Sequence, residues 1–276
     1  MDKKVEKINV MVNGMGDMAL NVMRHVLKDD RFELVPYALT GPNPQKHVVC
    51  VDSKEIVLYE PHQKEDLKFL RDEYKGLISV DFTHPTAVNE NAEFYCKNQL
   101  PFVMGTTGGD RERLNETVLN SNIVAVIAPN MAKQIVGFQA MMEFAANTFT
   151  ELFNGYSLKI RESHQKSKAD TSGTAKAMVG YFNKLGIPFS EDEIIKERDI
   201  SIQKNMGVPE KYLSGHGWHT YTLSSSDRTV EFEFTHNVNG RDIYARGTLD
   251  AVLFLDKKIK EGYKGKVFSM IDVLKG

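Results

Sequence analysis

The segment from Glu162 to Lys176 holds residue types that could bind a small anion and protonate it. It reads ESHQKSKADTSGTAK and places His164 and Lys168 four residues apart. An imidazole and an ammonium group can each act as a general acid when they are held near a bound substrate. His164 and Lys168 are therefore candidate catalytic residues, although a lone histidine is more often structural and the segment could be a solvated basic loop.

Ser172 marks the expected start of a helix over residues 173–185, because serine is a favoured N-cap residue. The backbone amides of Gly173 and Thr174 are then expected to be free to bind a carboxylate. Together with the basic residues before it, this helix start predicts complementary sites for a substrate with two carboxylates. Lys166 is better explained as a solvent-exposed charge.

A glycine motif near the start of the chain predicts a dinucleotide site. It lies between an expected strand and an expected helix and reads Gly14-Met15-Gly16-Asp17-Met18-Ala19, a G-x-G-x-x-A pattern. The first glycine allows a tight turn, the second lets the backbone approach a pyrophosphate, and the small third residue lets helix and strand pack closely. An ordinary glycine turn is the alternative, but the position in the first βαβ unit favours nucleotide binding.

The end of the second expected strand bears on the choice of cofactor. A carboxylate there would accept the adenosine ribose hydroxyls of NAD. This chain has Leu39-Thr40-Gly41-Pro42 instead, with Lys46 further on. The missing acid favours NADPH, with NADH still possible, and Thr40 can equally be a plain turn residue.

Two further loops follow expected parallel strands, where ligands of open α/β sheets bind. The candidate cofactor contacts in them are Gly105, Thr106 and Thr107 of the GTTG loop, and Pro129, Asn130 and Met131 of the APNM loop. Turn chemistry alone explains either loop equally well when it is taken singly.

These motifs need elements that position them, and the first half of the chain alternates strands and helices. Strands are expected at residues 8–13, 33–39, 77–82, 102–104 and 123–128. Helices are expected at residues 18–27, 66–74, 86–98 and 110–119, whereas residues 48–58 are too irregular to assign. This alternation predicts a Rossmann-like, doubly wound parallel sheet.

The second half predicts an α+β domain with an open mixed sheet. A helix over residues 132–148 leads to a strand over residues 156–162, and the chain turns β-rich from residue 215, as HTYTLSS, VEFEFTHNV and IYARGTLDAVLFL. A helical pattern over residues 248–260 could return to the first domain. We expect a dinucleotide-binding domain at residues 1–131, with 242–276 returning to it, and a substrate-binding and oligomerisation domain at residues 132–241.

The composition excludes several classes of protein. The 276 residues include 35 basic and 37 acidic side chains, so no overall field attracts nucleic acid. No apolar run approaches the roughly 18 residues that cross a bilayer, and the N-terminal residues lack a signal-peptide pattern. Cys50 and Cys96 have no CxxC spacing or nearby histidines, so no metal site is expected. Two thiols suit a reducing compartment, and we expect a cytoplasmic protein.

The segment from Glu162 resembles the E-x-H-H-x-x-K-x-D-x-P-S-G-T-A signature of dihydrodipicolinate reductase, also called 4-hydroxy-tetrahydrodipicolinate reductase. The resemblance extends over nearly the whole chain, through the glycine motif, DFTHP from Asp81, the GTTG and A-x-N loops, and THNVNGR with YARG near the C-terminus. Glutamine in place of the second histidine, the missing proline and the SGHGWHTYTL segment resemble the plant-type branch.

The resemblance implies NAD(P)H-dependent reduction of a cyclic dicarboxylic acid to tetrahydrodipicolinate in lysine and diaminopimelate synthesis. It makes His164 and Lys168 the catalytic pair. The candidate substrate-binding residues are then Gln165, Ser172, Gly173, Thr174 and Arg241. His164, Lys168 and Arg241 would form a small cationic pocket for a dianion. The cofactor would be lined by Asn13, Gly14, Met15, Gly16, Asp17, Met18, Thr40 and the two loops above.

The resemblance also implies a homo-oligomer, a dimer or a tetramer, and a location in the plastid stroma if the chain comes from a plant. Gln165 carries no charge, so at that position it can only form hydrogen bonds. Two other functions remain open: another two-domain amino-acid dehydrogenase, acting on aspartate or a semialdehyde, and a non-catalytic dinucleotide sensor.

Overall fold

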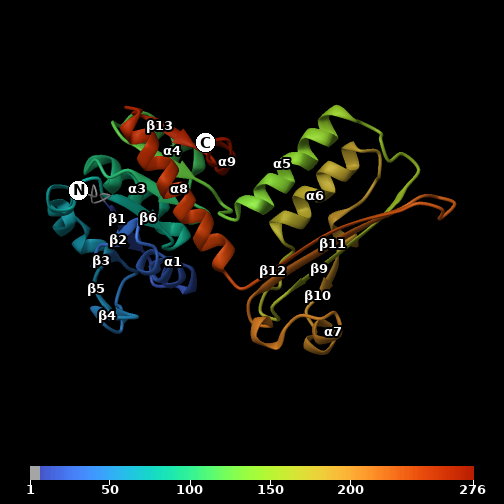
Figure 1. The fold of residues 1–276 in the computed structure, drawn as a ribbon, viewed down its shortest axis with the longest axis horizontal. Helices are drawn as coiled ribbons and strands as arrows, with labels where there is room; N and C mark the ends of the chain where they lie inside the picture. The colour runs from blue at the N-terminus through green and yellow to red at the C-terminus, as the bar shows by residue number, and fades with distance from the viewer. Residues whose placement is uncertain (1–6) are drawn as a thin grey trace, which may run out of the picture. The chain divides into compact units, whose positions relative to one another are not determined.

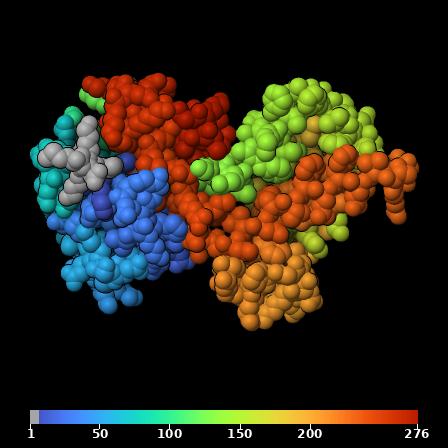
Figure 2. Space-filling model, in the orientation of Figure 1, coloured from blue at the N-terminus to red at the C-terminus, as the bar shows by residue number. Residues whose placement is uncertain are grey.

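The computed structural model describes residues 7–276, so the sequence-based statement on the N-terminal segment falls partly outside the described residues. The chain divides into two compact units, residues 7–133 with Asp242–Gly276, and Gln134–Arg241. The boundaries expected from the sequence were 131/132 and 241/242. In the first unit the C-terminal segment lies against the N-terminal half of the chain (Figures 1 and 2). No helix of residues 7–276 is long and apolar enough to cross a membrane.

A six-stranded parallel sheet forms the centre of the first unit, in the order β13-β8-β7-β6-β1-β2. Its strands are β1 (Ile8–Asn13), β2 (Phe32–Leu34), β6 (Ile78–Asp81), β7 (Phe102–Met104), β8 (Val124–Ile127) and β13 (Lys266–Phe268). The order runs in opposite directions from β1, which confirms the doubly wound fold. Val10, Met11 and Val12 are fully buried, as expected for a sheet that is covered on both faces.

Helices cover this sheet in two pairs. They are α1 (Asp17–Lys28) with α8 (Asp242–Lys260), and α3 (Val88–Lys97) with α4 (Arg111–Leu119). Because parallel crossovers are right-handed, connections that run in opposite directions from β1 place α1 and α3 on opposite faces. The remaining elements of this unit are η1 (Pro61–Phe69), α2 (Leu70–Glu73), η2 (Pro85–Ala87) and α9 (Met270–Lys275).

The single strand expected at residues 33–39 is wrong, because Pro36 divides it. Proline has no N–H to donate to a sheet, and its carbonyl accepts from Val57 instead. The chain after Pro36 therefore joins a second, three-stranded sheet of order β3-β5-β4. Its strands are β3 (Tyr37–Leu39), β4 (Val48–Val51) and β5 (Lys54–Tyr59), which account for the residues left unassigned from the sequence.

The second unit is a four-stranded mixed sheet of order β10-β9-β11-β12, as its α+β pattern predicted. Its strands are β9 (Ser157–His164), β10 (Ile195–Glu197), β11 (His216–Ser224) and β12 (Glu231–Asn239). Strand β10 runs parallel to β9, and the other pairs are antiparallel. The helices and turns are α5 (Lys133–Thr148), α6 (Gly173–Lys184), η3 (Glu191–Glu193), α7 (Ile200–Asn205) and η4 (Glu210–Tyr212).

Helices α5 and α6 pack on one face of this sheet. Phe182 of α6 and Met142 of α5 share a core with Ile160 and Tyr221 of the sheet. Strand register places Ile160, Glu162 and His164 on this helix-covered face, each opposite an inward residue of β11. The carboxyl end of β9 therefore directs His164 and Glu162 toward the start of α6.

The β-rich reading of IYARGTLDAVLFL is wrong, because these residues belong to α8. Ala245, Leu249 and Val252 are buried at three- and four-residue spacing, which is the spacing of one helix face. This helix carries the chain back to the first unit after β12 ends.

Candidate active site

The glycine turn at the end of β1 has the geometry that a dinucleotide requires. Gly14 has φ +102°, and a Cβ there would lie 2.2 Å from the Phe82 carbonyl oxygen, so only glycine fits. Gly16 is the N-cap of α1, and a Cβ on it would meet nothing within 4 Å. Ala19 is fully buried against the sheet. The turn therefore leaves open space beside the amides at the start of α1, which fits a pyrophosphate.

Asn13 is buried and braces this turn with its side chain. Its Oδ1 accepts from the Leu39 amide at 2.8 Å, and its Nδ2 donates to the Tyr95 hydroxyl at 3.0 Å. The remaining motif residues, Met15, Asp17 and Met18, are half-buried or exposed at the start of α1. Asp17 is an acid in the first turn, where the helix dipole favours negative charge.

Asp81 connects the glycine turn to the GTTG loop. This fully buried carboxylate accepts from the Tyr95 hydroxyl at 2.7 Å, the Thr106 hydroxyl at 2.6 Å and the Thr83 hydroxyl at 2.8 Å. Burial raises the pKa of Tyr95 well above its usual value, which keeps this hydroxyl a donor. Asp81 begins the DFTHP motif, from which no role could be assigned to it, although an acid that ends a buried strand is a recognisable signal of a functional residue.

The other expected cofactor residues differ in exposure. Thr107 and Pro129 are exposed, whereas Thr106 is buried and its hydroxyl donates a hydrogen bond to Asp81. Met131 is 2% exposed, so its side chain belongs to the core. Gly105 and Asn130 follow β7 and β8 of the parallel sheet: Gly105 packs on the Phe82 ring, and the Asn130 Oδ1 accepts from the Ala132 amide. Thr40 follows β3 of the three-stranded sheet, is half-buried and donates its amide to the Tyr59 carbonyl.

In the second unit, His164 ends β9 with one ring nitrogen engaged. Its Nδ1 is 3.1 Å from the His216 carbonyl oxygen, so Nδ1 carries the proton in this contact and Nε2 is left as a buried acceptor without a partner. Burial lowers the pKa of His164 to about 4, although the nearby Glu162 opposes this shift. The expected cationic pocket therefore contains a neutral imidazole at pH 7.

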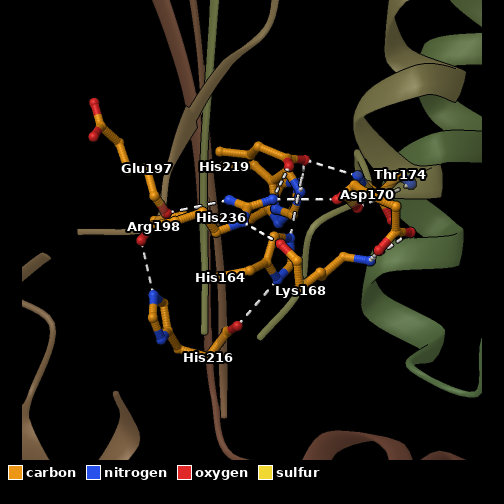
Figure 3. Close-up of polar contacts among 12 residues, drawn as sticks. His164, Lys168, Asp170, Thr174, Glu197, Arg198, His216, His219 and His236 are labelled. Atoms are coloured by element: carbon orange, nitrogen blue, oxygen red, sulfur yellow. Dashed lines mark hydrogen bonds and ion pairs between the residues drawn. The ribbon is translucent and has the colours of Figure 1, made fainter. Parts of the chain in front are cut away.

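The Lys168 side chain forms an ion pair with Asp170 of the same loop. Its Nζ donates to both carboxylate oxygens of Asp170 at 2.9 Å (Figure 3). The hydrogen bond from Lys168 lowers the pKa of Asp170. Because Asp170 is solvent-exposed, a substrate carboxylate can compete with it for the ammonium group at little cost.

The start of α6 corrects one expectation. Ser172 is the N-cap, but its Oγ accepts from the Thr174 amide at 3.2 Å, so that amide is not free. Within residues 7–276, no protein group accepts from the Gly173 amide. The start of α6 therefore offers the Gly173 amide to a carboxylate, whereas the Thr174 amide is already bonded to Ser172.

The two remaining candidates follow β9 and β12, the two strands that flank β11. Gln165 follows His164 and is half-buried. Arg241 follows β12, and its Nη1 lies 3.5 Å from where a Cβ on Gly215 would be. Gly217, two residues on, pairs with His164 across β9 and β11. The structure thus gathers Gln165, His164, Lys168 and the α6 start in one loop cluster, with Arg241 at the same end of β11.

Arg198, which the sequence analysis missed, joins this cluster from the segment after β10. Its Nη2 is 2.5 Å from Oε1 of the fully buried Glu162, and its Nε donates to the Lys168 carbonyl at 2.6 Å. The second oxygen of Glu162 accepts from the Ser172 amide at 3.0 Å. Arg198 lies more than 20 residues from the motif, so no local spacing pointed to it.

Two further histidines were missed because they lie within strands. His219 and His236 stack with ring centroids 4.7 Å apart on the helix-covered face. Burial lowers the pKa of His236 to about 4 and that of His219 well below its usual value. Both histidines occupy positions of β11 and β12 whose alternation with polar residues places them on the buried face, and this pattern could have identified them.

Glu162, His164 and His219 each offer a possible metal-ligand atom within 4.8 Å of the other two. Arg198 and the Ser172 amide already engage both oxygens of Glu162. A divalent cation there would also face the positive charges of Arg198 and Lys168 at short range. The charges around this cluster therefore suit an anion or a proton better than a metal ion.

Two family models match the chain. The N-terminal model of dihydrodipicolinate reductase covers residues 8–131, and the C-terminal model covers residues 135–274. The chain is 47% identical over 270 residues to 4-hydroxy-tetrahydrodipicolinate reductase 2, chloroplastic, of Arabidopsis thaliana, covering 97% of this chain and 77% of that relative. It is 49% identical over 245 residues to the probable 4-hydroxy-tetrahydrodipicolinate reductase 1, chloroplastic, of Oryza sativa subsp. japonica, covering 88% and 71%.

A solved structure shares the fold. The dipicolinate-bound dihydrodipicolinate reductase from Paenisporosarcina sp. TG-14 aligns with a TM-score of 0.64 at 18% identity, covering 96% of this chain and 98% of that one. The two family models, the plant relatives and this fold agree with the resemblance that the sequence motifs carry. The chain belongs to the dihydrodipicolinate reductase family.

Proposed function

We propose that this chain is a 4-hydroxy-tetrahydrodipicolinate reductase that uses NADPH. Its substrate is a cyclic, unsaturated dicarboxylic acid, which is reduced with loss of water to tetrahydrodipicolinate for lysine and diaminopimelate synthesis. One observation carries the proposal: Lys168, neutral His164 and the start of α6 meet in one loop cluster beside β9. A cation, a proton acceptor and a free amide at one place suit a carboxylate-bearing ring.

The first unit would hold the cofactor, which supplies a hydride when bound. The open space beside Gly16 and the start of α1 accommodate the pyrophosphate. The residues after β3 are Thr40, Gly41 and Pro42, and none carries a carboxylate. An adenosine 2′-phosphate therefore meets no like charge in this segment, and Lys46 follows, which supports NADPH over NADH.

The substrate carboxylates would bind at two places in the second unit. The Gly173 amide and the Ser172 hydroxyl receive one carboxylate, with the Thr174 amide and Gln165 alongside. Lys168 exchanges Asp170 for the other, and Arg241 adds charge at the same end of β11. Both positions are polar and accessible, so binding replaces existing contacts and exposes no buried apolar surface.

Lys168 would supply the proton that the reaction consumes. Its ammonium group neutralises the negative charge that develops on the ring and donates a proton as the ring hydroxyl leaves as water. His164 has a buried, unprotonated Nε2 that can share in this transfer. Glu162 lies 4.0 Å from that nitrogen, so a proton gained by His164 is stabilised electrostatically.

The direct test is a coupled assay. Dihydrodipicolinate synthase, pyruvate and aspartate semialdehyde generate the substrate, and NADPH absorbance follows its reduction. We expect oxidation well above the rate without this protein, and faster with NADPH than with NADH. Oxidation at the background rate would remove the proposal and leave the dinucleotide-sensor alternative, whereas turnover of aspartate or a semialdehyde alone would support the dehydrogenase alternative.

We also propose that the protein forms a homo-oligomer, in the cytoplasm or the plastid stroma. Strand β12 is an edge strand, and Phe232 on it is 41% exposed. Helix α5 exposes Met141 and Phe144 at 64% and 65%. Sedimentation velocity distinguishes dimer from tetramer, and a monomer at micromolar concentration would contradict the proposal.

A further inference from the structure

The Arg198 side chain bonds to both the strand and the loop of the candidate site. It lies after β10, and its side chain is 17% exposed. Nη2 contacts Glu162 Oε1 at 2.5 Å and the Asp170 carbonyl at 3.3 Å, whereas Nε donates to the Lys168 carbonyl at 2.6 Å (Figure 3). Through these bonds Arg198 connects β9 to the loop over residues 165–171.

Glu162 extends the same connection to α6. Its other oxygen accepts from the Ser172 amide at 3.0 Å, at the residue that caps the helix. One buried ion pair therefore fixes three parts of the site: the strand with His164, the loop with Lys168, and the helix start with Gly173. Gln203 supports the same strand end, because its Nε2 donates to the His164 carbonyl at 2.7 Å.

Only a guanidinium group can form all of these bonds from position 198. A buried carboxylate is costly unless it is paired and hydrogen-bonded, and Glu162 is fully buried. The planar fork of arginine donates in several directions at once, so Arg198 bonds to the Glu162 carboxylate, to two loop carbonyls and to the Glu197 carbonyl together. A lysine ammonium at this position could neutralise Glu162 but could not also reach both loop carbonyls.

Within the described chain, the loop has few other restraints. Lys168 donates its amide to the Gln165 carbonyl, and its side chain pairs with exposed Asp170, which belongs to the same loop. Neither bond connects the loop to the sheet. The bonds from Arg198 to the Lys168 and Asp170 carbonyls therefore set where the Lys168 ammonium group lies relative to His164.

We propose that Arg198 is a positioning residue for the reductase reaction, acting through Glu162 and the loop carbonyls to hold Lys168 and the α6 start in register with His164. This inference rests on the proposed function. It assigns Arg198 no contact with the substrate. It predicts that loss of the guanidinium group lowers turnover and substrate affinity while the cofactor still binds to the first unit.

The test compares Arg198→Ala and Arg198→Lys with Lys196→Ala, an exposed basic residue of β10. We expect kcat to fall about 10²-fold in Arg198→Ala, because misplacement by about 1 Å costs that much. We expect a higher KM for the substrate and NADPH affinity within about twofold of wild type, measured by fluorescence. Added guanidinium ion should restore part of the lost kcat in Arg198→Ala only, and Arg198→Lys should remain impaired.

Hydrogen exchange separates positioning from general loss of structure. We expect the amides of residues 166–172 to exchange faster in Arg198→Ala, with unchanged exchange in α5 and in the first unit. If kcat stays within about twofold of wild type and the loop keeps its protection, the inference is wrong. If Arg198→Ala does not fold, Arg198→Lys carries the same two measurements, and wild-type values in both overturn it.

The two proposals fail in different ways. If wild-type protein oxidises no NADPH in the coupled assay, the proposed function is wrong. The exchange of residues 166–172 in the Arg198 variants then still tests whether this side chain holds the loop. If wild type is active and the variants are too, the function stands and the positioning role of Arg198 is rejected.

Discussion

Individual side chains in the second unit have environments that set their charge. Lys168 is half-buried and is paired with an exposed carboxylate, whereas His164, His219 and His236 are held neutral by burial. The site therefore combines one available ammonium group with a neutral imidazole. This division suits a reaction in which a cation binds an anion and a second group exchanges a proton.

Lys168→Ala tests the role of the ammonium group. We expect kcat to fall about 10²- to 10⁴-fold, the usual contribution of a positioned acid, with NADPH affinity nearly unchanged. Lys166→Ala is the matched control, because Lys166 is exposed in the same loop. Steady-state kinetics in the coupled assay make the comparison, and wild-type turnover in Lys168→Ala would reject the assignment.

The buried histidines predict how stability depends on pH. The pKa of His236 is lowered from 6.5 to about 4, so the unfolded chain binds a proton there at a higher pH than the folded chain. Stability from this residue is full above pH 6.5, is lost as the pH falls toward 4, and amounts to about 3 kcal/mol.

Urea denaturation at a series of pH values between 4 and 7 checks this dependence. The free energy of unfolding should decrease as the pH falls, and the slope should be smaller in His236→Phe than in wild type. His62→Gln is the control, because His62 is exposed. An unchanged slope in His236→Phe would contradict the expectation.

At the scale of elements, turns and helix ends decide where the functional groups lie. The chain passes from one sheet to another at Pro36. The Ser172 side chain accepts from the Thr174 amide, which is then not free to bind a ligand. The glycine turn after β1 is the clearest case, since its two glycines serve different purposes. Gly14 permits close contact within the protein, whereas Gly16 leaves space at its surface.

Gly14→Ala and Gly16→Ala should therefore have different effects. In Gly14→Ala the new Cβ would meet the Phe82 carbonyl at 2.2 Å with φ at +102°, so we expect lower stability by about 1–3 kcal/mol and no NADPH binding. In Gly16→Ala no protein atom is met, so we expect near-wild-type stability with weaker NADPH binding. Thermal melts and fluorescence titration measure both, and equal melting temperatures for the two variants would contradict the distinction.

At the scale of the whole molecule, distant parts of the chain complete each unit. Helix α8 follows β1 by most of the length of the chain, yet it packs on β6, β7 and β8 of the sheet that contains β1. Gly247 in this helix packs on the backbone of the APNM loop, where a Cβ would lie 1.8 Å from the Met131 carbonyl oxygen. The C-terminal segment therefore supports one of the candidate cofactor loops.

Gly247→Ala should destabilise the first unit and weaken NADPH binding. The expected loss is about 1–3 kcal/mol, typical of overpacking at a closely packed site. Gly180→Ala in α6 is the matched control, since a Cβ there meets nothing within 4 Å and alanine favours a helix. Chemical denaturation should show the first variant less stable and the second at least as stable as wild type, and the reverse order would contradict this packing.

The sequence by itself determined the elements whose signals are local. Strand β7 was predicted with its observed bounds, and the glycine motif, the Ser172 cap and the two-domain alternation could be read from neighbouring residues. Periodic burial and cap chemistry act over a few residues, so a single sequence reveals them. The assignment of residues 243–255 as β-rich failed because β-branched and aromatic residues there also satisfy a helix face.

Only the tertiary structure decided which distant groups meet. Arg198 reaches Glu162 across 36 positions of the chain, His219 stacks on His236 from another strand, and Asp81 ties Tyr95 to Thr106. The sequence supplied the residue types of His164 and Lys168, but only the fold decided that burial lowers the pKa of His164 and that Lys168 bonds to Asp170. Such contacts depend on strand order and register, which place residues far apart in the chain side by side.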